Sequence, residues 1–167
     1  GRWCRPNRKD LTEPKIAHHH PILDSRQKLA PDFPLITDGE LRELVGEYAK
    51  AAHLASDIGF DFVDIKHCHG YLLHELLGAH TRPGDYGGIF ENRTRFLKET
   101  VQAIRSLAPR LTIGVRLSAF DLISFKPDAS QGGRGVPDLL ESNPPYLYGF
   151  GVSQTDSTQY DLTETFL

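Results

Sequence analysis

Two short runs rich in β-branched and aromatic residues, with helical patterns between them, constrain the fold of this chain more than any other feature. The first run covers residues 60–65 and the second covers residues 111–118, and both have the composition of β-strands. The residues between them suffice for a helical crossover, so we expect parallel pairing with a right-handed connection. Alternation divides the first run and the residues after it between two faces: Phe60, Phe62, Asp64 and Lys66 on one, and Val63, Ile65 and His67 on the other.

Three helical patterns surround these strands. Thr37 and Glu40 have the spacing of a capping box, an apolar stripe at helical spacing follows them, and Gly59 provides the stop. A shorter apolar pattern covers residues 70–77, and a strong apolar stripe covers residues 91–107. Strands that alternate with helices in this way are typical of an α/β protein.

The rest of the chain divides by composition. Residues 1–36 are rich in proline and lack a sustained period, so we expect a loop-rich entry over the surface, with the three histidines at 18–20 solvated. Residues 37–118 form the predicted helix–strand–helix–strand core. Residues 119–160 are rich in glycine, proline and aspartate and are interpreted as a long insertion, which covers a functional site or a subunit contact or is simply solvated. Residues 161–167 have the pattern of the start of another helix.

Two α/β architectures fit this order, the doubly wound sheet and the (β/α)8 barrel. No glycine-rich turn of the GxGxxG type follows either strand, which disfavours the doubly wound sheet. Polar and reactive residues gather instead at the C-terminal ends of both strands, the face that carries the active site of a barrel. A complete barrel needs roughly 250 residues, and two parallel strands alone would leave open edges. Because the chain also contains no methionine, we predict an incomplete (β/α)8 TIM barrel, the middle strands and helices of a larger one.

Composition and charge exclude several classes of partner. The net charge is −3 and no basic stripe is visible, which argues against a nucleic-acid partner. No apolar run approaches the roughly 20 residues that span a bilayer, so we expect no membrane partner. Cys4 and Cys68 are the two cysteines, too few for a disulfide scaffold, a cysteine-rich zinc site or an iron–sulfur site. A reducing, cytoplasmic location is the default expectation.

The densest group of chemically active residues covers residues 64–71, with the sequence Asp-Ile-Lys-His-Cys-His-Gly-Tyr, at the end of the first strand. One interpretation is metal binding, as in hydrolases built on barrels, because His67 and His69 on an extended segment can approach one ion. The second strand, however, ends with Arg116, a cation where a further metal ligand is needed. This disfavours a metal site.

The other interpretation is that this face holds an anion or an electron-rich ring. Arg116 has a permanent charge and a rigid set of donors, and Lys66, His69 and Tyr71 are further donors at the neighbouring strand end. Such a set suits a substrate that gains negative charge on oxygen. A tyrosine phenol is protonated at neutral pH and can serve as the proton source.

Four runs of residues, in this order along the chain, resemble the old yellow enzyme family. They cover residues 59–65, 69–73, 85–96 and 114–118, and together they span most of residues 37–120. More broadly, the chain is similar to the NADH:flavin oxidoreductases, which include dienoyl-CoA reductase-like and trimethylamine dehydrogenase-like members. The resemblance covers the central portion of these proteins, so residues 1–167 hold part of one active site, and the segment itself is expected to be inactive alone.

This resemblance implies a flavin-dependent oxidoreductase on an eight-stranded barrel that holds FMN at its C-terminal face. NADH or NADPH would reduce the flavin, and hydride would then pass to a small-molecule acceptor such as an activated alkene. Arg116 matches the cofactor-binding arginine near the flavin N1–C2 carbonyl. His69 matches a histidine that hydrogen-bonds a substrate carbonyl, and Tyr71 matches the tyrosine that protonates the substrate carbon opposite the hydride. The polar residues within 85–96 are expected to fix a loop and a helix start.

One departure from the family's pattern concerns Lys66. The substrate-binding pair usually begins with a histidine, but Lys66 stands at the aligned position and His67 follows one residue later. A one-residue step turns a strand side chain to the opposite face, so His67 is no simple replacement. Lys66 is expected to act as a catalytic residue together with His69 and Tyr71. The sequence does not identify the acceptor, and a homo-oligomer is possible. Two alternatives remain: a metal-dependent hydrolase using His67 and His69, and a non-catalytic barrel subunit.

Overall fold

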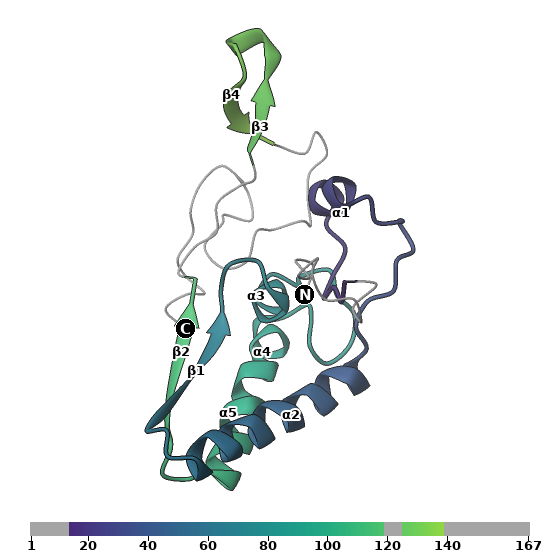
Figure 1. Cartoon of the computed structure of the whole chain (residues 1–167). Coiled ribbons are helices and arrows are strands. Elements are labelled where there is room, and N and C mark those ends of the chain that lie inside the picture. Colours follow the sequence, from purple (N-terminus) through teal and green to yellow (C-terminus); the bar gives the residue numbers. More distant parts are fainter. Residues whose placement is uncertain (1–13, 119–124, 139–167) are drawn as a thin grey trace.

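The structure is a computed structural model, and it describes residues 14–118 and 125–138. Its helices and strands in chain order are α1 (Pro21–Gln27), α2 (Asp38–Asp57), β1 (Phe62–His67), α3 (Leu72–Leu77), α4 (Phe90–Arg93), α5 (Arg95–Leu107), β2 (Thr112–Leu117), β3 (Phe125–Asp128), a 3₁₀ turn (Ala129–Gln131) and β4 (Arg134–Pro137). Figure 1 shows α2 and α5 beside one another, next to the β1–β2 pair, with the β3–β4 hairpin at the far end of the molecule.

Strands β1 and β2 pair in parallel, which confirms the predicted crossover. Phe62 lies opposite Thr112 and His67 lies opposite Leu117, and α3, α4 and α5 form the connection between the strands. The first strand begins two residues later than the sequence pattern indicates. Gly59 has a left-handed backbone with φ of 92°, and the Phe60 amide still donates to the Ala55 carbonyl of α2. Gly59 and Phe60 therefore belong to the turn that ends α2, and the strand begins after them.

Helix α2 begins where the capping box predicts. The Glu40 amide donates to Thr37 Oγ1 at 3.1 Å, and the Thr37 amide donates to Glu40 Oε2 at 2.8 Å. The two bonds satisfy amides that the first helical turn leaves without a partner. The apolar stripe of α2 packs on α5, where the ring of Tyr48 meets the ring of Phe96 edge-on at 5.9 Å.

The single helix predicted over residues 91–107 is two helices, α4 and α5, separated at Thr94. The Thr94 hydroxyl donates to the carbonyls of Phe90 at 3.0 Å and of Glu91 at 3.3 Å. A side chain that bonds to nearby carbonyls competes with the helical ladder, which explains the break. The prediction of one continuous helix was wrong at this residue.

The core of the described residues lies on one side of the β1–β2 pair. Ile65 and His67 are only 2% and 1% exposed, because they face the helices, whereas Phe62 on the opposite face is 62% exposed. The alternation predicted for this strand is therefore confirmed. The described strands do not close into a barrel, and the sheet face away from the helices is open.

The segment before α2 is more ordered than its composition indicates. It contains α1 and a parallel bridge between Ile16 and Leu35, and the structure buries His18 and His20. The expectation of three solvated histidines was wrong for these two. Contacts with residues far along the chain explain the difference, since the Ala17 amide donates to Glu75 Oε2 at 2.8 Å.

Part of the segment after β2 is also regular. Strands β3 and β4 form an antiparallel hairpin, and Arg26 of α1 donates to the Phe125 carbonyl at 2.7 Å and to Asp138 at 2.9 Å. Residues 119–124 and 139–167 lie outside the described residues, and with them most of the predicted insertion and the helix start expected over residues 161–167. Within the described part of the chain, no helix has both the length and the apolar character needed to cross a bilayer.

Candidate functional site

The candidate site lies on the open face of the β1–β2 pair, toward the carboxyl ends of the strands. Lys66 of β1 and Arg116 of β2 are direct register partners, so their side chains leave the sheet next to one another on the same face. The Arg116 side chain is 58% exposed. The sequence predicted these two cations at neighbouring strand ends, and the register places them side by side.

Asp64 forms an ion pair with Arg116 that sequence reasoning missed. Arg116 Nη2 donates to Asp64 Oδ2 at 2.5 Å, along the diagonal between adjacent strands. The one indication in the sequence was the alternation of β1, which puts Asp64 on the same face as Lys66. A surface ion pair of this kind contributes only about 0.2–1 kcal/mol to stability. Its main effect is therefore to orient the Arg116 guanidinium.

Lys66 contacts the ring of Tyr71. The distance from Lys66 Nζ to the ring centroid is 3.8 Å, a cation–π geometry worth about 0.5–1 kcal/mol at an exposed site. Within the described residues Lys66 forms no ion pair. The contact joins Tyr71, which precedes α3, to the strand end that also bears Arg116.

A tight turn after β1 brings Tyr71 back toward the strand. His69 has φ of 61° and Gly70 has φ of 70°, so two consecutive residues adopt the left-handed conformation. The Gly70 amide donates to His74 Nδ1 at 2.8 Å, which ties the turn to α3. A histidine with positive φ costs of order 1 kcal/mol, and such strain is found at functional sites. His69 itself is exposed.

His67 belongs to the core and not to this face. It is buried against the helices, and its ring centroid lies 6.4 Å from that of Phe96. Burial, and in second place the neighbouring His74, lowers the pKa of His67 to about 4. His69 is exposed whereas His67 is buried, so the structure does not present the two histidines together as the hydrolase alternative needs.

Across residues 14–118 and 125–138, no group of three histidine, cysteine, aspartate or glutamate side chains has the arrangement to hold a metal ion.

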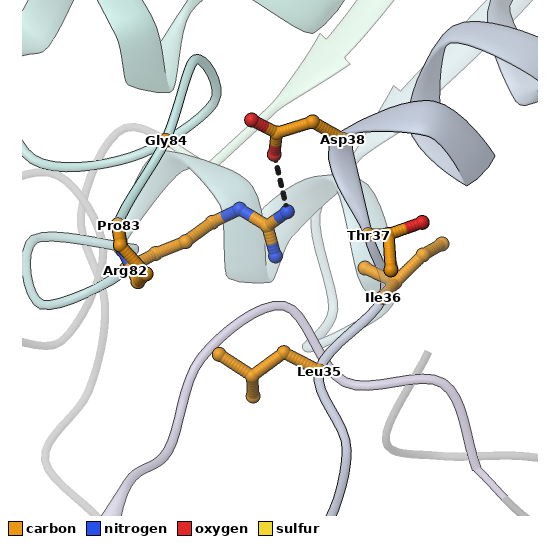
Figure 2. A pocket seen from close by; sticks show the side chains of 7 residues that line it. All are labelled: Leu35, Ile36, Thr37, Asp38, Arg82, Pro83 and Gly84. Carbon is orange, nitrogen blue, oxygen red and sulfur yellow. Dashed lines mark hydrogen bonds and ion pairs between the residues drawn. The ribbon is translucent and has the colours of Figure 1, made fainter.

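A pocket lined by described residues lies elsewhere, at the start of α2 (Figure 2). It has a volume of about 390 Å³, and its lining consists of Leu35, Ile36, Thr37, Asp38, Arg82, Pro83 and Gly84. Arg82 is buried and donates to Asp38 Oδ1 at 2.7 Å and to the Ala17 carbonyl at 2.9 Å. None of the predicted site residues lines this pocket.

The pair in this pocket fixes the scaffold. Burial pushes the pKa of Asp38 upward, but the hydrogen bonds from Arg82 and the Asp85 amide, with the charges of Arg82 and Arg42, outweigh burial and lower it. Asp38 is therefore held in its charged form, and it ties the loop after α3 to the start of α2.

The polar residues within 85–96 hold the loop and the start of α4 and α5, as predicted. Arg93 is buried and donates to the carbonyls of Gly88 and Leu77. Arg95 donates to the Asp85 carbonyl and to Asn92 Oδ1, both at 2.8 Å. These contacts tie α4 to α3, and the start of α5 to α4 and to the loop that precedes it.

Comparison with known proteins gives concordant results. Residues 17–134 match the family described as NADH:flavin oxidoreductase / NADH oxidase. The chain is 33% identical over 141 residues to 12-oxophytodienoate reductase 1 of Oryza sativa subsp. japonica, covering 77% of this chain and 37% of the relative. It is 38% identical over 104 residues to an NADPH dehydrogenase of Clostridium acetobutylicum, covering 60% of this chain and 28% of the relative.

Among solved structures, a morphinone reductase matches with a TM-score of 0.46 and 32% identity, covering 51% of this chain and 23% of that protein. The chain thus spans from about a quarter to about two fifths of the length of these proteins.

Proposed function

Because the chain belongs to the NADH:flavin oxidoreductase / NADH oxidase family, we propose that the protein is a flavin-dependent oxidoreductase that passes hydride from NAD(P)H through FMN to an acceptor such as an activated alkene. The similarity to a 12-oxophytodienoate reductase and to an NADPH dehydrogenase supports this activity. The observation that carries the proposal is the placement of Arg116, Lys66 and, through its ring contact, Tyr71 at one end of the β1–β2 pair.

The residues on this face fit the ring end of FMN by the chemistry of their donors. A guanidinium has five N–H donors, and the Asp64 carboxylate accepts from Nη2 of Arg116, so further donors remain for a ligand. The carbonyl edge of the flavin ring gains negative charge on reduction, and a fixed guanidinium stabilises such charge. We therefore assign Arg116 as the residue that would hold this edge of FMN.

When bound, FMN would supply hydride transfer from NAD(P)H to one alkene carbon, so that NAD(P)H, one proton and the alkene would yield NAD(P)⁺ and the saturated product. In the proposal, Tyr71 donates the proton to the other alkene carbon and regains one from solvent. Lys66 and His69 donate hydrogen bonds to the substrate carbonyl oxygen, which draws electron density away from the alkene. The cation of Lys66 also fixes the Tyr71 ring from one side.

We also propose that this β–α–β unit is the middle portion of a (β/α)8 barrel. In the described residues, β1 and β2 pair with one another and each leaves its other edge free. The open face carries the exposed Phe62, and a barrel would cover that side chain in its interior layers. The division into an entry segment, a core over residues 37–118 and an insertion belongs to the same proposal.

The proposal further includes a small-molecule acceptor, a cytoplasmic location and a homo-oligomer. The free, buried thiol of Cys68 is compatible with a reducing compartment. Of the alternatives, the hydrolase loses its basis because His67 is buried on the helix side. A non-catalytic barrel subunit is distinguished by experiment, since it would bind FMN and not turn over.

The test is to load the full-length protein that contains this portion of the barrel with FMN and to measure NAD(P)H oxidation with and without an activated alkene. We expect stoichiometric FMN and alkene-dependent oxidation in the wild type, and weakened FMN binding in Arg116→Met. Arg110→Met is the matched control, because Arg110 is exposed just before the amino end of β2. FMN affinity equal in all three proteins would refute the assignment of Arg116, and bound FMN without turnover would favour the non-catalytic subunit.

A further inference from the structure

We infer that Asp64 is a positioning residue, which holds the guanidinium of Arg116 and through it sets how strongly the site prefers reduced over oxidised flavin. This inference rests on the proposed function, because it concerns the same face. Neither the comparisons nor the sequence motifs assign a role to this carboxylate.

The geometry of the strand pair makes Asp64 the anchor of Arg116. Lys66 and Arg116 are register partners, and two like charges directly opposite one another repel. Asp64 lies two residues before Lys66 on the same face, and it accepts from Arg116 Nη2 at 2.5 Å. The pair therefore draws the guanidinium back along the sheet and away from Lys66.

Gly114 on β2 lies opposite Asp64 and has no side chain on this face. Gly114 is the register partner of Asp64, and a Cβ at that position would lie 4.0 Å from Asp64 Oδ1. With no side chain at Gly114, the Asp64 carboxylate reaches along the face toward Arg116 without an intervening group.

Lys66 does not compete for the carboxylate. Its Nζ atom stands over the Tyr71 ring at 3.8 Å, and it forms no ion pair within the part of the chain that the structure describes. Among the described residues of β1 and β2, this face thus carries two cations, Lys66 and Arg116, and one anion, Asp64, a net charge of +1. Without the carboxylate the same face would carry +2 at the position assigned to the flavin edge.

The charge of Asp64 has a consequence for the flavin. Reduction adds negative charge to the ring, and a more positive site favours the reduced form over the oxidised form. Asp64 offsets part of the charge of Arg116, so the carboxylate limits this preference. Its removal is expected to raise the ratio of the affinities for reduced and oxidised FMN by on the order of tenfold.

The experiment measures the reduction potential of the full-length, FMN-loaded protein in three variants of this segment. Asp64→Asn keeps an oxygen that accepts from Arg116 and removes the charge, so we expect a positive shift, about 30 mV for a tenfold change in a two-electron couple. Asp64→Glu restores the charge and is expected to return the potential to the wild-type value. Asp61→Asn is the matched control, an exposed carboxylate just before β1, and no shift is expected.

A second measurement separates the positioning role from a general effect on the protein. In an Arg116→Met background, Asp64→Asn is expected to shift the potential by less than half of its shift in the wild type, because the carboxylate acts through the guanidinium. An equal shift in both backgrounds, or no shift in Asp64→Asn, overturns the inference. A wild-type protein that binds no FMN overturns the proposed function together with it, whereas a flavin-loaded wild type with an unresponsive Asp64→Asn refutes the inference alone.

Discussion

The buried His67 predicts a specific loss of stability in acid. Its pKa is about 4 in the folded protein, whereas an unperturbed histidine titrates near 6.5. As the pH falls through 6.5, His67 binds a proton in the unfolded chain, whereas in the folded chain it stays uncharged until about pH 4. The contribution of uncharged His67 to the free energy of unfolding is therefore fully present above pH 6.5 and is lost progressively as the pH falls to 4.

The size of the effect follows from the pKa difference. One pKa unit corresponds to 1.36 kcal/mol, so a lowering of about 2.5 units amounts to about 3 kcal/mol. Cys68 and His74 are buried beside this strand end, and the charge of His74 adds repulsion to the cost of burial. His67→Leu removes the titrating group and fills a similar volume on the apolar side of β1.

The assay is urea unfolding followed by circular dichroism at several pH values between 7.5 and 4. We expect the free energy of unfolding to fall by about 3 kcal/mol more in the wild type than in His67→Leu over this range. His53→Leu is the control, because the imidazole of His53 is about half exposed on α2. Parallel pH profiles for wild type and His67→Leu would show that this histidine is not held uncharged by burial, and the reasoning would be refuted.

Substitutions at four further positions test the proposed chemistry and the packing of the scaffold. Tyr71→Phe is expected to slow alkene reduction by on the order of 10²–10⁴-fold and to leave flavin reduction by NAD(P)H nearly unchanged, as stopped-flow absorbance can measure. Lys66→Met is expected to slow the alkene step by about tenfold, with Lys66→Arg recovering most of the rate because it keeps the cation over the ring. Arg82→Met breaks a buried ion pair and is expected to cost about 3 kcal/mol in urea unfolding. Thr37→Ala removes the helix cap and is expected to cost about 1 kcal/mol in the same assay.

The features that local chemistry determines were predictable from the sequence. The capping box at Thr37 and Glu40 places the start of α2, because both of its hydrogen bonds lie within four residues. Strand periodicity places Asp64 and Lys66 on one face and His67 on the other, because a β-strand alternates its side chains. Parallel pairing followed from the helices between the strands.

The features that depend on distant contacts were not predictable in this way. The burial of the segment near Ala17 results from Glu75 and Arg82, more than fifty residues later. The break at Thr94 depends on a choice between two sets of hydrogen-bond partners for one hydroxyl. The pairing of Asp64 with Arg116 needed the strand register, which alternation alone does not provide.

The proposed function requires that the end of β2 and the turn after β1 bring the guanidinium of Arg116 and the phenol of Tyr71 to one flavin ring. A crystal structure of the protein loaded with FMN and an unreactive substrate analogue tests it most directly. We expect the Arg116 guanidinium within hydrogen-bond distance of the carbonyl edge of the ring and the Tyr71 hydroxyl over the analogue on the same ring. A flavin bound on another face, with Arg116 and Tyr71 both away from it, would contradict the account.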